Sequence, residues 1–239
     1  MALLSDMLLC FLRYLRFILP VAGTLLLIHL FFPVPRELFR KMLHAAAFTS
    51  APVIMHVANG CEHPCLVSVL VLVSFGVAAW PLLAFAERFS WYSDLLVERK
   101  AHEIRRSLLK FFCGTAALIA VCWGLLDLPM VAATSILMWG FGDAAAALVG
   151  KRWGKYPTGL PLADPKKTWE GSGAMWAVST LVGTACLTAA GTHFGMALVQ
   201  AALTGLVGAY VELITKGGDD TLTVPAANAC VLTVLSLLL

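Results

Sequence analysis

Four acidic side chains stand within or at the ends of long apolar runs, where an ionisable group is costly unless it faces a polar cavity. Asp143 lies inside the run 135–150, Glu212 ends another run, and Asp219 and Asp220 follow two glycines. Mg²⁺ prefers a few carboxylates together with phosphate oxygens and retained water. We therefore expect the four carboxylates to share one or two Mg²⁺ ions with a nucleotide, although a solvated turn also explains the Asp pair.

A long polar loop, residues 150–173, reads GKRWGKYPTGLPLADPKKTWEGSG and separates two apolar runs. Loops of this length are usually functional or disordered. Lysines supply positive charge, and glycines before a helix start leave backbone amides that favour a phosphate. Glu170 is either a metal ligand or an acid that complements the helix dipole. The residues that we assign to phosphate binding here are Gly150, Lys155, Lys166, Lys167, Gly171 and Ser172.

A third polar patch reads RKMLH and contains Arg40, Lys41 and His44. Helical spacing brings Lys41 and His44 to one side of a turn. His44 lies just inside an apolar run, so it is either a hydrogen-bonded core histidine or a group that serves the reacting hydroxyl or a phosphate. Because the chain lacks a GxxxxGK[ST] loop, a P-loop enzyme is excluded.

The composition requires a membrane to hold these groups. Of 239 residues, 60% are hydrophobic and 13% are charged, whereas roughly a quarter are charged in globular proteins. The runs lack the alternation of a β-barrel, so we predict an all-α, polytopic integral membrane protein. We expect eight transmembrane helices, or seven if one of the first two runs is interfacial; they lie near 15–32, 43–58, 65–86, 108–126, 128–149, 174–191, 195–214 and 222–239.

The loops between these runs alternate in their content of Lys and Arg, which orients membrane proteins. Loops near 33–42, 87–107, 150–173 and 215–221 are basic, whereas the alternate loops contain neither residue. Eight spans with the N-terminus outside place every basic loop, and so the site, on the cytoplasmic face. Arg13 and Arg16 are the exception. We expect no cleaved signal peptide, and the membrane is a bacterial inner membrane or an organelle membrane.

The segments RKMLH, FGDAAAALVGKRWGK, KKTWEGSGA and E...DDTLTVP occur in this order. Together they resemble the membrane kinases of polyprenols, such as dolichol, phytol and farnesol kinases, with wider kinship to phosphatidate cytidylyltransferase. The resemblance covers about residues 36–230 of what we interpret as one domain, 1–239. It implies an enzyme that uses CTP, or another nucleoside triphosphate, with Mg²⁺ on a lipid at the cytoplasmic surface.

Matched by position, the site residues that the resemblance implies fall in three blocks of this sequence. The first is Arg40, Lys41 and His44; the core is Asp143, Lys166, Lys167, Glu170 and Gly171; the last is Glu212, Asp219 and Asp220. Within them, it implies catalytic roles for Asp143, Lys167, Glu170, His44 and Lys41, and phosphate contacts for Arg40.

The leading hypothesis is a kinase, in which the hydroxyl of an isoprenoid or other lipid alcohol attacks the γ-phosphorus of CTP. The first alternative is a phosphatidate cytidylyltransferase, which makes CDP-diacylglycerol from CTP and phosphatidate. A cation-coupled transporter is the alternative of another class, but the polar residues gather on one face and no inverted repeat is evident. The expected partners are the lipid, the nucleotide and the membrane, with no nucleic acid. Small residues on several spans permit a homodimer.

Overall fold

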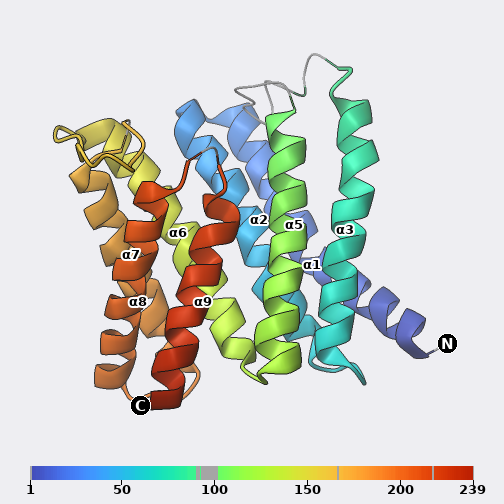
Figure 1. The fold of residues 1–239 in the computed structure, drawn as a ribbon. Helices are drawn as coiled ribbons and strands as arrows, with labels where there is room; N and C mark the ends of the chain where they lie inside the picture. Colours follow the sequence, from blue (N-terminus) through green and yellow to red (C-terminus); the bar gives the residue numbers. More distant parts are fainter. Residues whose placement is uncertain (1, 90–91, 93–101, 166, 217, 239) are drawn as a thin grey trace. The chain divides into compact units, whose positions relative to one another are not determined.

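The computed structural model describes residues 2–89, 92, 102–165, 167–216 and 218–238, and these residues form long helices (Figure 1). Among them no strand forms, and the one bridge of β type joins Pro157 to Thr168. The all-α prediction is therefore confirmed. The helices are α1 (Ala2–Phe31), α2 (Arg36–Ala58), α3 (Pro64–Ala86), α5 (Glu103–Ile119) with the π-helical turn η1 (Ala120–Leu125), α6 (Pro129–Trp153), α7 (Trp169–Ala189), α8 (Phe194–Ile214) and α9 (Asp220–Leu238).

Seven helices in the described part of the chain are long and apolar enough to cross a membrane: α1, α3, α5 with η1, α6, α7, α8 and α9. This confirms the prediction of a multi-pass membrane protein with about seven or eight spans. The helix α2 is outside this set. The first predicted run lies in α1, which is a candidate span and begins well before residue 15.

The chain divides into two compact units, Met1–Gly124 and Leu125–Leu239; the interpretation as one functional domain stays a prediction. In the first unit, α1 packs against α2 and α3, and α3 packs against α5. The hydroxyls of Tyr14 and Ser50 lie 2.7 Å apart between α1 and α2. The ring of Phe75 on α3 contacts Tyr14 edge-on and stacks on Phe112 of α5, with centroids 5.2 Å and 6.0 Å away. Aromatic packing thus holds this unit together.

In the second unit, α6 packs against α7 and α9, and α8 also packs against both of these helices. The hydroxyl of Ser179 on α7 donates to the carbonyl of Met138 on α6 over 2.9 Å. Glycines allow the close approach of the backbones: Gly142 lies against Ser179, and Gly183 lies against Met138 and Ala201. Such small residues are typical of tightly packed membrane helices, and here they bring α7 close to α6 and α8.

Candidate active site

The start of α7 is fixed by a cap and by a loop that folds back onto it. Thr168 is the N-cap, and its hydroxyl accepts a hydrogen bond from the amide of Gly171 over 3.2 Å. The carboxylate of Glu170 accepts from the amides of Lys155 and Tyr156, at 2.9 Å and 3.3 Å. Glu170 therefore binds the loop backbone in this structure, an arrangement that the sequence did not indicate.

The glycines of the motif pack α6 against this capped end. A Cβ added to Gly171 would lie 3.0 Å from the carbonyl oxygen of Ala146 and 3.4 Å from Cα of Gly150. Gly150 and Gly154 both face the side chain of Thr168. The glycines at the end of α6 therefore serve the packing of this helix against the start of α7.

The helix start offers fewer free donors than we predicted. The amide of Gly171 donates to the Thr168 hydroxyl, the amide of Ser172 donates to the Thr168 carbonyl over 3.0 Å, and the amide of Trp169 donates to the carbonyl of Tyr156 over 3.0 Å. This corrects the expectation of open amides, because the cap and the returning loop already use them.

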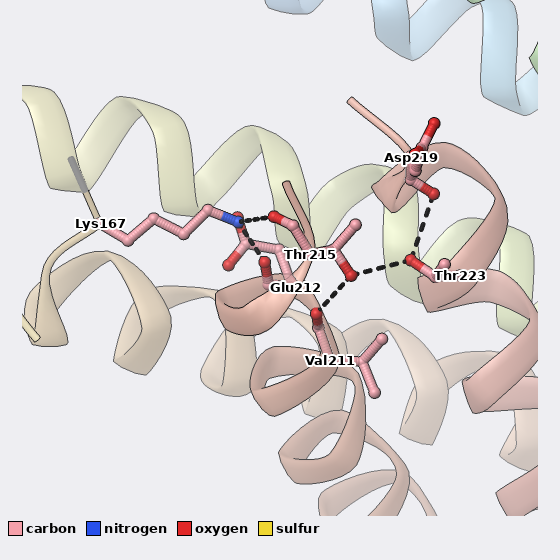
Figure 2. A network of polar contacts seen from close by, with 6 residues as sticks. All are labelled: Lys167, Val211, Glu212, Thr215, Asp219 and Thr223. Carbon is pink, nitrogen blue, oxygen red and sulfur yellow. Dashed lines mark hydrogen bonds and ion pairs between the residues drawn. The ribbon is translucent and has the colours of Figure 1, made fainter. Parts of the chain in front are cut away.

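Lys167 reaches across to the end of α8 (Figure 2). Its Nζ lies 2.8 Å from Oε1 of Glu212. The same Nζ donates to the main-chain carbonyl of Glu212 and, over 3.5 Å, to that of Thr215. The Glu212 side chain is only 9% exposed and that of Lys167 is 21% exposed, so the ion pair is largely screened from solvent. Lys167 thus neutralises a buried carboxylate and satisfies carbonyls that a helix end leaves unpaired.

Two further predicted metal ligands lie within electrostatic range of Glu212. The carboxylates of Asp143 on α6 and Asp220 on α9 both interact electrostatically with Glu212. Glu212 is therefore within electrostatic range of one carboxylate on each of two neighbouring helices, α6 and α9. Within the described residues, however, no group of three or more His, Cys, Asp or Glu side chains is placed to hold a metal by itself.

Asp219 lies at the turn before α9, and its main-chain carbonyl accepts hydrogen bonds from the first turn of this helix. Its carbonyl accepts from the amide of Thr223 over 3.0 Å and from the Thr223 hydroxyl over 3.2 Å. The Thr223 hydroxyl also lies 3.1 Å from that of Thr215, which joins the ends of α8 and α9 (Figure 2). Thr168, Thr215 and Thr223 were missed from sequence; only Thr168, a good N-cap residue before an apolar run, carried a usable signal.

The patch Arg40, Lys41 and His44 lies on α2, in the unit Met1–Gly124. Arg40 forms an ion pair with Glu37 at 3.2 Å, and Lys41 is buried with 5% of its surface exposed. Nδ1 of His44 lies 2.8 Å from the carbonyl oxygen of Arg40. This contact supports the interpretation of His44 as a hydrogen-bonded histidine.

The structure does not test two of the predicted phosphate contacts, Lys155 and Lys166. Lys155 is exposed on the loop, and its backbone rather than its side chain meets Glu170. Lys166 lies outside the described residues. The roles of both lysines stay predictions.

No family model and no solved structure matches the chain. A phytol kinase from Synechocystis sp. is 36% identical to it over 106 residues, which are 44% of this chain and 45% of that protein. The chain thus matches less than half the length of this relative. This similarity confirms the resemblance to polyprenol and phytol kinases that the motifs of the chain predicted.

Proposed function

We propose that this protein transfers a phosphate group from CTP, or from another nucleoside triphosphate, to an isoprenoid or other lipid alcohol at the cytoplasmic face of its membrane. The observation that carries the proposal is the ion pair between Lys167, in the loop before α7, and the buried Glu212 at the end of α8, with Asp143 and Asp220 in electrostatic interaction with Glu212. The similarity to a protein named phytol kinase supports the same reaction class.

Phosphoryl transfer needs mainly positioning and electrostatic stabilisation, and the site offers both. The ammonium of Lys167 has three donors, and three acceptors surround it in this structure. A phosphate oxygen would replace the weakest of them, the 3.5 Å contact with Thr215. Lys167 would then hold the transferring group while its contact with Glu212 keeps the side chain aligned.

The donor set fits Mg²⁺ that is bound partly by the nucleotide. Magnesium sites at nucleotides use one or two carboxylates with phosphate oxygens and water, so they need no cage of three protein ligands. We assign Asp143 and Asp220 to this ion, because both carboxylates interact electrostatically with Glu212, beside the Lys167 ammonium. When bound, the ion would neutralise charge that develops on the phosphates.

The test is a product analysis with purified protein, Mg²⁺, CTP and a panel of phytol, farnesol, dolichol and phosphatidate. The kinase proposal predicts CDP and a phosphorylated alcohol. Pyrophosphate with a CDP-lipid would instead establish a cytidylyltransferase. Replacement of CTP by ATP or UTP in the same assay identifies the donor.

The negative control for this assay is the Asp143→Asn variant, which should form both products at least about 10²-fold more slowly than the wild type. If no product forms with wild-type protein, proteoliposomes come next. Cation uptake that depends on Asp143 and not on CTP would favour the transporter.

A further inference from the structure

The loop between α6 and α7 folds back on itself, and backbone contacts join its two sides. The amide of Thr158 donates to the carbonyl of Lys167 over 3.1 Å, beside the antiparallel bridge between Pro157 and Thr168. The backbone that carries Lys167 is therefore held from the opposite side of the loop. What anchors that opposite side decides how firmly Lys167 is placed.

Glu170 supplies this anchor from the first turn of α7. One carboxylate oxygen accepts from the amides of Lys155 and Tyr156, and the second lies 3.4 Å from the amide of Tyr156. Charged acceptors make stronger hydrogen bonds than neutral ones. Glu170 thus ties α7 to residues 155 and 156, directly before the segment that pairs with Lys167 and Thr168.

We propose that Glu170 is a positioning residue of the phosphate site, and that it acts through two backbone hydrogen bonds rather than as a metal ligand. The inference rests on the proposed function. By closing the loop, Glu170 fixes the position of the Lys167 backbone. This position in turn determines whether the Lys167 ammonium can contact Glu212 and a phosphate. The carboxylate oxygens that a metal would need are already turned to the loop amides.

Hydrogen exchange tests the clamp, by which we mean the hydrogen bonds from the amides of Lys155 and Tyr156 to Glu170, without any substrate. In Glu170→Ala, the amides of residues 155 and 156 should exchange about tenfold faster than in the wild type, as expected for the loss of charge-assisted hydrogen bonds. Glu170→Gln keeps an acceptor oxygen and should stay near the wild type. Lys155→Ala is the matched control, because it removes a side chain and keeps the N–H. Unchanged exchange in Glu170→Ala would overturn the clamp, whether or not the protein is a kinase.

Kinetics separate the positioning role from a metal role. We expect Glu170→Ala to lower kcat/KM for the nucleotide by about tenfold or more, and Glu170→Gln to recover most of it. The Mg²⁺ concentration for half-maximal activity should be the same in both variants and the wild type. If Glu170→Gln is as impaired as Glu170→Ala and needs more Mg²⁺, Glu170 is a metal ligand and the proposal is wrong.

Discussion

Nζ of Lys167 lies 2.8 Å from the carboxylate of Glu212, a residue 45 positions later in the chain and only 7% exposed. A buried carboxylate without its partner is strongly destabilising, so Lys167 serves the fold as well as the proposed chemistry. The two roles can be separated by experiment. The stability of the fold depends on the balance of charge between Lys167 and Glu212, whereas the proposed activity depends on the Lys167 ammonium itself.

Lys167→Met should lower the free energy of unfolding by on the order of 3 kcal/mol, since Glu212 would remain buried without a counter-charge. Adding Glu212→Gln should restore most of this loss but not the kinase activity. Unfolding in detergent, followed by circular dichroism, measures the first effect. Equal stability of the single and double variants would show that the ion pair contributes little.

Gly171→Ala should destabilise the packing of α6 on α7 by about 1–3 kcal/mol, because the new methyl group would press on the backbone at Ala146 and Gly150. Gly173→Ala is the control two residues along, where nothing lies within 4 Å of the added Cβ. This control should be neutral or slightly stabilising, since Ala favours helices. Similar melting temperatures for the two variants would refute the close approach of the helices.

Asp143→Asn should lower the rate of phosphoryl transfer by about 10²-fold or more at saturating Mg²⁺, as is usual when one group that stabilises the transition state is lost. Asp127→Asn removes the same charge in the turn before α6. The φ of Asp127 is 56°, a backbone region that Asn also tolerates, so this variant should keep its activity. An Asp143→Asn enzyme with full turnover would exclude the metal role.

Thr168→Val should destabilise the start of α7 by about 1 kcal/mol, because it removes the oxygen that caps Gly171 and keeps the methyl group that packs on Gly154. Thr168→Ser keeps the cap and should lose less. Amide exchange at Gly171 reports the difference directly. The cap would be unimportant if both variants protected this amide equally.

Much of the fold could be predicted because it depends on local composition. Long apolar runs must form helices in lipid, where each backbone amide and carbonyl needs a partner within its own segment. Each of the eight predicted runs lies largely within a described helix. The ends were less accurate: α2 begins at Arg36 rather than near residue 43, since charged residues continue a helix as readily as apolar ones.

Which residues form the candidate site could also be predicted from the sequence. Carboxylates such as Asp143 and Glu212 are costly in an apolar run unless they face a polar partner. Their partners were not readable. The choice of Glu212 by Lys167, the use of Glu170 as a loop anchor and the packing role of Gly150 depend on which helices meet and in what register. Sequence alone determined where the membrane helices lie and which polar groups need a partner. Only tertiary packing decided the pairings, because a hydrogen bond or ion pair forms between atoms a few ångströms apart, whatever their distance along the chain.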